Sequence, residues 1–194
     1  MTIDQKTLAC VNLFGVFGAI PELCRLSDEA KELVKGKNAS IGFDIKNTAS
    51  ATLSFANGAC TLTEGLDGAD ILLPFSTPEK FNRMIDGKYT PIPRKGFTKI
   101  SFLTGAFMKL TDVLTKYLRP DPKALEDPEF FRINTLLTLH VICGAICAIG
   151  NNDKVGRAIS WTALCGCRLQ AARLSAFRQK ITFLLPYTPT LRNS

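Results

Sequence analysis

"FSTPEKFNRMIDGKYTPIP", residues 75–93, decides the fold because it ends a strand and opens a helix within a few positions. Ser76, followed three residues later by Glu79, has the spacing of a capping box, in which each side chain satisfies a backbone N–H of the first helical turn. Pro78 is tolerated in that turn, where its missing N–H has no intrahelical partner. The pattern predicts a helix from about Thr77 to Ile85.

The predicted helix has a single apolar face. Phe81, Met84 and Ile85 stand at positions i, i+3 and i+4, which brings them to one side of a helix. Gly87 supplies a left-handed stop, and the prolines at positions 91 and 93 restrict the exit chain. We expect this helix to lay its apolar face on a sheet or over a cavity.

Upstream, from Ala39, the period of the sequence changes to two, as in half-buried strands. Asn57-Gly58 and Asp67-Gly68 tolerate positive φ and predict hairpin turns, so we expect four strands in meander order in one antiparallel sheet. Because "ILL" at residues 71–73 is continuously apolar, helices must cover one face. "FTKISFL", residues 97–103, is expected to form a fifth strand. The four segments are "ASIGFDIKN", "SATLSFANG", "ACTLTEG" and "ADILLPF".

Helical patterns flank these strands. Residues 4–35 predict a helix pair that is broken at Pro21, with Ser27 capping the second helix. A long helix from about Glu129 contains an uncharged run at residues 133–152. We interpret this run as a core helix rather than a membrane span, and we interpret the apolar start of the chain in the same way rather than as a signal peptide.

Composition favours one globular domain with a distinct end. The 194 residues are 46% hydrophobic and 21% charged, and the formal charge is +7. Residues 154–194 contain seven basic and no acidic residues, so the other 24 − 7 = 17 basic residues balance all 17 acidic ones. The basic residues of this end fall on no single helical face, which gives no support for a nucleic-acid partner. We interpret residues 161–194 as foreign to the fold, the alternative being a basic tail that docks on anionic lipid.

The residues that usually carry catalysis are sparse. Seven scattered cysteines indicate reduced thiols in a cytoplasmic protein. His140, the one histidine, lies near Cys143 and Cys147 on a single apolar helix, and we interpret all three as core residues rather than zinc ligands. Neither a phosphate loop nor a nucleophile elbow is present. We therefore expect no catalytic residue, no metal and no cofactor.

Apolar side chains, in contrast, are concentrated within about forty residues around the opening stretch. Most of them must belong to a core, but flexible Met and Phe side chains can also line a cavity for an aliphatic ligand. The residues that we predict to line such a cavity are Phe75, Phe81, Met84, Ile85, Phe102, Phe107 and Met108.

Two further motifs extend the pattern. "GFTKI" at residues 96–100 and "AFMKL" at residues 106–110 follow the opening stretch at nearly the same distances as two motifs of a known protein family. Residues 38–118 thereby resemble the sterol carrier protein 2 family, with residues 1–160 as one such domain. The resemblance implies an α+β fold in which helices cover one face of a five-stranded, mainly antiparallel sheet. It also implies an apolar tunnel for a sterol, fatty acid, acyl-CoA or phospholipid, without catalysis.

The expected function is therefore lipid binding or carriage in the cytoplasm. The expected partners are an apolar lipid ligand and, transiently, a membrane, with no nucleic acid. The family usually has Gly-Asp or Gly-Asn after the Lys-Ile strand, whereas this chain has Ser101-Phe102 there. The resemblance therefore does not determine the shape of the tunnel. The alternative function is an accessory or protein-interaction module of the same fold with a filled core and no lipid.

Overall fold

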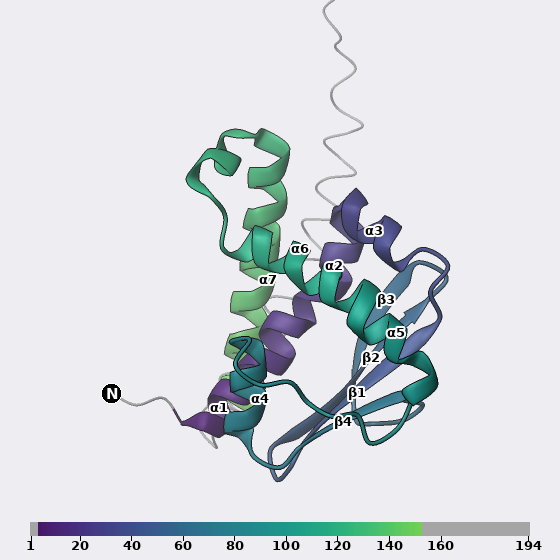
Figure 1. The fold of residues 1–194 in the computed structure, drawn as a ribbon. Helices are drawn as coiled ribbons and strands as arrows, with labels where there is room; N and C mark the ends of the chain where they lie inside the picture. The colour runs from purple at the N-terminus through teal and green to yellow at the C-terminus, as the bar shows by residue number, and fades with distance from the viewer. Residues whose placement is uncertain (1–3, 153–194) are drawn as a thin grey trace, which may run out of the picture.

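The computed structural model describes residues 4–152, and the predictions made for residues 153–194 lie outside this range. The fold is α+β, as expected, with helices on one side of a four-stranded mixed sheet (Figure 1). The strand order is β3-β2-β1-β4. The strands are β1 (Ala39–Ile45), β2 (Ala49–Ala56), β3 (Ala59–Glu64) and β4 (Ile71–Phe75).

The sheet is not the predicted meander. β1, β2 and β3 are antiparallel neighbours, and Asn57 and Gly58 form a tight turn with positive φ between β2 and β3, as predicted. β4, however, pairs in parallel with β1, placing Leu73 beside Phe43. The hairpin predicted at Asp67-Gly68 is therefore wrong, because the chain crosses there from one edge of the sheet to the other.

The crossing segment, residues 65–70, lies on the face of the sheet opposite the helices. The Thr52 hydroxyl donates to the Gly65 carbonyl at 2.8 Å, and the Ser40 hydroxyl donates to the Gly68 carbonyl at 2.8 Å. Gly42 leaves the room for this segment, since a β-carbon there would lie 2.8 Å from the Ala69 β-carbon. Side-chain hydroxyls on β1 and β2 thus hold the crossover in place.

The predicted fifth strand is also wrong. The segment that was expected to form it is helical, and a single antiparallel bridge between Leu72 and Lys95 stands next to β4 instead. Gly96 turns the chain away with φ +90°, and a β-carbon on it would lie 2.8 Å from the Ile71 α-carbon. The chain therefore touches the sheet edge once and then leaves it. The helical segment consists of η3 (Phe97–Lys99), α5 (Ile100–Phe102) and η4 (Leu103–Phe107).

The N-terminal helix runs without a break from Gln5 to Leu26, so the predicted break at Pro21 is wrong. Pro21 stands in the first turn of α2, after a 3-10 segment, where its missing N–H costs no α-helical bond. The N-terminal helix consists of α1 (Gln5–Cys10), η1 (Val11–Val16), η2 (Phe17–Ala19) and α2 (Ile20–Leu26). The second helix of the predicted pair, α3 (Asp28–Val34), begins as expected, with the Ser27 hydroxyl accepting from the Ala30 N–H.

The helix of the opening stretch, α4 (Pro78–Ile85), has its cap at Thr77, one residue later than predicted. The Thr77 hydroxyl, not that of Ser76, accepts from the Lys80 N–H at 3.4 Å. A helix with Pro at its first position places its cap immediately before that proline. Gly87 has φ +72° and ends the helix as predicted.

The remaining helices complete the layer above the sheet. The predicted long C-terminal helix is α7 (Pro128–Asn152). It is preceded by α6 (Met108–Leu118) and η5 (Pro122–Glu126). The N-terminal helix lies between the sheet and α7 (Figure 1). In the described part of the chain, this helix and α7 are long and apolar enough to cross a membrane. The N-terminal helix is mostly buried, as expected for a core helix, whereas α7 is mostly exposed, so the interpretation of its uncharged run as a core helix is wrong.

Candidate functional site

Three of the predicted cavity residues lie in the closed interior of the fold. Phe75, Phe81 and Phe107 are buried between the sheet and the helices. The Phe81 ring meets that of Phe75 edge-on at a centroid distance of 5.1 Å, and Phe107 lies 6.3 Å from Phe43 of β1. Such distances are those of packed aromatic pairs. These three rings are in contact with core side chains, and they line none of the hollows described below.

The other four predicted residues are closer to solvent. Met84 and Ile85 are half-buried and pack on the edge of the core. Phe102 is also half-buried, and its ring lies 5.1 Å from that of Phe55. Met108 is half-exposed, with 52% of its surface accessible. The structure thus spreads the seven predicted residues from the centre of the core to the surface.

Phe102 also lines a hollow of about 390 Å³, which we call the Phe102 pocket. One wall is the start of β1 and the turn before it, residues 36–39, and the other is the helical segment that follows Gly96. Ala106 lies in this second wall, within η4, a π-helical turn. Such turns occur frequently at functional sites. The second wall consists of Thr98, Lys99, Ser101, Phe102 and Ala106.

Lys99 joins the two walls at the mouth of the pocket. Its ammonium donates to the Asp70 carboxylate at 2.8 Å and to the Asn38 carbonyl at 3.2 Å. The hydrogen bond from Lys99, and weaker ones from Ser40, lower the pKa of the Asp70 carboxyl from its ordinary value. The pair holds the helical segment against the sheet edge, and Lys37 adds a second cation to the lining.

Large apolar side chains are exposed beside this pocket. Ile92 and Phe97 are 78% and 61% exposed, and Ile100 and Met108 are also open to solvent. They lie on the connector and on the helical segment that forms the second wall, next to the basic residues at positions 94, 95 and 99. Apolar and cationic side chains are therefore interspersed along residues 92–108.

A second hollow, of about 530 Å³, lies between α2, the β2–β3 turn and α7. Cys24 and Cys60 stand in its wall, and the hydrogen bond between the two thiols lowers the pKa of Cys24 and raises that of Cys60. His140 is exposed at its mouth. The interpretation of His140 as a core residue is therefore wrong, because it lies on a flank of α7 that faces solvent.

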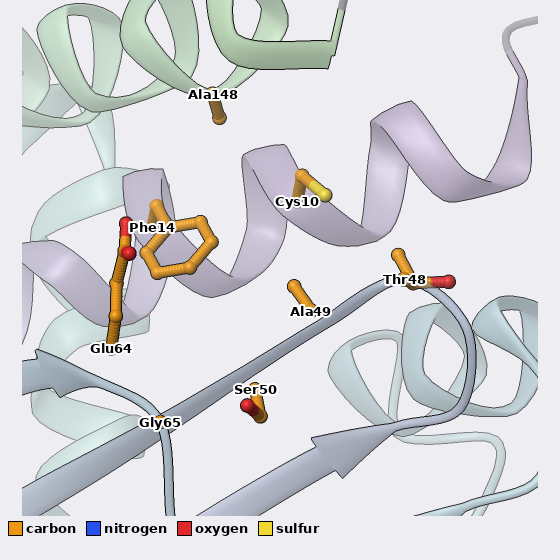
Figure 2. A pocket seen from close by; sticks show the side chains of 8 residues that line it. All are labelled: Cys10, Phe14, Thr48, Ala49, Ser50, Glu64, Gly65 and Ala148. Atoms are coloured by element: carbon orange, nitrogen blue, oxygen red, sulfur yellow. The ribbon is translucent and has the colours of Figure 1, made fainter.

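A third hollow, of about 300 Å³, lies where the N-terminal helix passes the end of the sheet (Figure 2). Cys10 and Phe14 line it from the helix, Thr48 from the β1–β2 turn, Glu64 from β3, and Ala148 from α7. Only Glu64 among them carries a charge. This arrangement offers neither a nucleophile with an adjacent base nor a convergent set of donors.

Within residues 4–152, no group of three or more His, Cys, Asp or Glu side chains is placed to hold a metal ion. No family model matches the chain, and no curated protein matches it either. The resemblance to the sterol carrier protein 2 family therefore remains an interpretation of the sequence motifs.

Sequence reasoning missed two polar features that organise the fold. One is the pairing of Asp70 with Lys99. The other is Asn82 of α4, which is buried and donates to the side-chain and backbone oxygens of Gln5 at 2.9 and 3.1 Å while accepting from Asn12 at 3.0 Å. The sequence signal for Asn82 was a polar residue adjacent to the apolar face of the opening helix, which is common on solvated helices as well.

Proposed function

We propose that the protein binds a lipid without catalysis and that the Phe102 pocket is where the lipid enters. The observation that carries this proposal is the group of exposed apolar side chains at residues 92–108, in the segment that also supplies one wall of a hollow lined by Phe102, whose ring packs on Phe55 of the core. Exposed apolar groups of this kind mark contact sites for ligands, membranes or proteins. Membership of the sterol carrier protein 2 family and a cytoplasmic location belong to the same proposal.

The ligand class follows from the size and charge of the pocket. Its volume of about 390 Å³ lies at the lower end of the range of small-molecule sites, so one acyl chain suits it better than a two-chain phospholipid. Lys37 in the lining favours an anionic head group, whereas the charge of Lys99 is balanced by Asp70. Burying about eight methylenes contributes roughly 6 kcal/mol before ordering costs. A fatty acid that binds with a dissociation constant between about 40 μM and 1 mM is therefore the expected ligand.

The test is titration of the full chain with a fluorescent fatty acid. Ala106→Leu, which fills the pocket from η4, should abolish saturable binding, and Ile100→Ser should weaken it. Leu125→Ser is the matched control, because Leu125 is 36% exposed and Ile100 is 38% exposed, and the pocket is lined by Lys99 and Ser101 on either side of Ile100 but by no residue of η5. Saturable binding that survives Ala106→Leu would refute the assignment of this pocket.

A second candidate function is an accessory or protein-interaction module with a filled core. It is favoured by the aromatic cluster, in which Phe17 lies 4.9 Å from Phe43 and about 6 Å from Phe81 and Phe107. Native mass spectrometry separates the two candidates. A lipid that co-purifies, or that raises the melting temperature, supports lipid binding, whereas a lipid-free protein with no thermal response supports the filled module.

A further inference from the structure

The outer face of α7 is apolar along most of its length. Five large side chains of this face are each between 48% and 53% exposed, although they belong to a helix that packs on the protein with its other side. From first to last they span about 27 Å at 1.5 Å per residue. We call this set the α7 face, and it consists of Phe131, Leu139, Ile142, Ile146 and Ile149.

The α7 face has the spacing of a helix-pairing seam. Leu139, Ile142, Ile146 and Ile149 follow one another at intervals of three, four and three residues. This is the a and d pattern with which two helices interdigitate their side chains. Thr135 and Thr138 continue the same side of the helix toward Phe131. The charged residue at its edge is Arg132, which lies about 20° beyond Leu139 at 100° per residue and is paired with Glu129.

The opposite side of α7 is already occupied. A β-carbon on Gly144 would lie 2.9 Å from the Gly15 α-carbon, so α7 is pressed against the N-terminal helix there. Gly144 stands about 190° around the helix from the mean direction of the α7 face, at 100° per residue. The α7 face therefore points away from its own core and is carried by a helix that is held firmly in place.

We propose that the α7 face pairs with the α7 face of a second copy of this chain in a two-fold dimer. A two-fold axis needs one self-complementary surface, and an uncharged stripe of this kind meets that condition. Two such stripes would bury on the order of 1,000 Å² in total, the lower limit for a specific interface.

Lipid is the other occupant that the length and hydropathy of α7 allow. Contact with lipid requires no regular spacing of side chains, whereas the α7 face has the a and d spacing of a helix pair. The pairing is also independent of the proposed lipid function, since the Phe102 pocket lies on other elements. Lipid binding does not require the dimer, and the dimer does not require lipid binding. Either experiment can therefore fail while the other succeeds.

The test is sedimentation equilibrium of the full chain at concentrations from about 1 to 100 μM, at low and at high salt. We expect a dimer that persists in high salt, because apolar contacts are not screened. Ile146→Lys should raise the dissociation constant at least about 100-fold, since it places a charge in the seam. Ile142→Gln, which carries no charge, should weaken the dimer less.

Leu136→Lys is the matched control. Leu136 is 37% exposed on the same helix but lies about 60° outside the nearest member of the α7 face, at 100° per residue, so its substitution should leave the dimer intact. A monomer at the highest concentration would overturn the proposal, whatever else covers the face. Equal loss of dimer in Leu136→Lys and Ile146→Lys would overturn it as well.

Discussion

Gly15 and Gly144 meet where the N-terminal helix crosses α7. A β-carbon on Gly144 would lie 2.7 Å from the Phe14 carbonyl oxygen, and one on Gly15 would lie 3.1 Å from the Val141 carbonyl oxygen. At this crossing neither helix has room for a side chain, because backbone stands against backbone. The contact fixes the position of α7, and therefore the direction in which its apolar face points.

The first prediction concerns this crossing. Gly144→Ala should destabilise the protein by about 2 kcal/mol, because overpacking of a tight contact forces the backbone apart. Gly105→Ala is the control, since a β-carbon there meets nothing within 4 Å and the substitution should be neutral or slightly stabilising. Urea unfolding monitored by circular dichroism measures both. Equal stabilities of the two variants would contradict the tight crossing.

The second prediction concerns Asn82. Asn82→Leu keeps the approximate size of the side chain but leaves the Gln5 oxygens and the half-buried Asn12 amide without their partner. The expected loss is about 1 kcal/mol, the net contribution of a typical hydrogen bond, because water reaches the exposed Gln5. Thermal or urea unfolding measures it.

Thr104→Val is the control for Asn82→Leu. It removes a hydrogen bond from the Thr104 hydroxyl to the Ile100 carbonyl, but Thr104 is exposed, so water can replace the lost partner. We expect a change below about 0.5 kcal/mol, as for most surface substitutions. If Asn82→Leu reduced the free energy of unfolding as little as Thr104→Val, the hydrogen bonds of Asn82 with Gln5 and Asn12 would not hold α4 to the N-terminal helix.

Some of these features were predictable from short stretches of the sequence, and others were not. The Ser27 cap, the Asn57-Gly58 turn and the Gly87 stop were predicted because each is decided by the conformation of a few neighbouring residues. Asp67-Gly68 contained the same kind of signal, and Gly68 indeed has φ +71°. A local turn does not determine which strand the next segment pairs with, so the parallel pairing of β4 with β1 could not be read from it.

The candidate site shows the same limit at the level of side chains. Phe107 and Met108 are adjacent, and both were predicted to line a cavity, yet Phe107 is 6% exposed and Met108 is 52% exposed. Apolar composition predicts that a region is apolar, whereas burial depends on the orientation of a helix whose neighbours are distant in the sequence. The aromatic contacts of Phe17 with Phe43 and Phe81 likewise join segments that no local pattern relates.

The third prediction separates close approach from backbone conformation at two glycines. Gly96 and Gly87 both have positive φ, but a β-carbon on Gly96 would meet the Asp70 carbonyl and the Ile71 α-carbon, whereas one on Gly87 would meet nothing within 4 Å. Gly87→Ala should cost about 1 kcal/mol from conformation alone. Gly96→Ala should cost at least about 2 kcal/mol more, because it also disrupts the bridge of Lys95 to Leu72. Equal losses in urea unfolding would mean that this close approach is absent.

The fourth prediction concerns the titration of Asp70. The hydrogen bond from Lys99, supported by Ser40, lowers the pKa of Asp70 in the folded protein, so its stabilising contribution is present above the unfolded pKa of about 3.9 and is lost as the pH falls through the folded pKa. Lys99→Met should move the Asp70 carboxyl titration to higher pH, as followed by carbon NMR. Since both side chains are more than a third exposed, the stability change at neutral pH should stay below about 1 kcal/mol.

Lys116→Met is the matched control for this titration. It removes the exposed ion pair of Lys116 with Glu29 on the helical layer and lowers the net charge by the same amount as Lys99→Met. If the Asp70 titration reports the local hydrogen bond, only Lys99→Met should move it, and added salt should change the difference little because the two groups are in contact. An equal shift in both variants would instead assign the lowered pKa to the overall charge of the protein, and the contact of Lys99 with Asp70 at the mouth of the Phe102 pocket would lose its support.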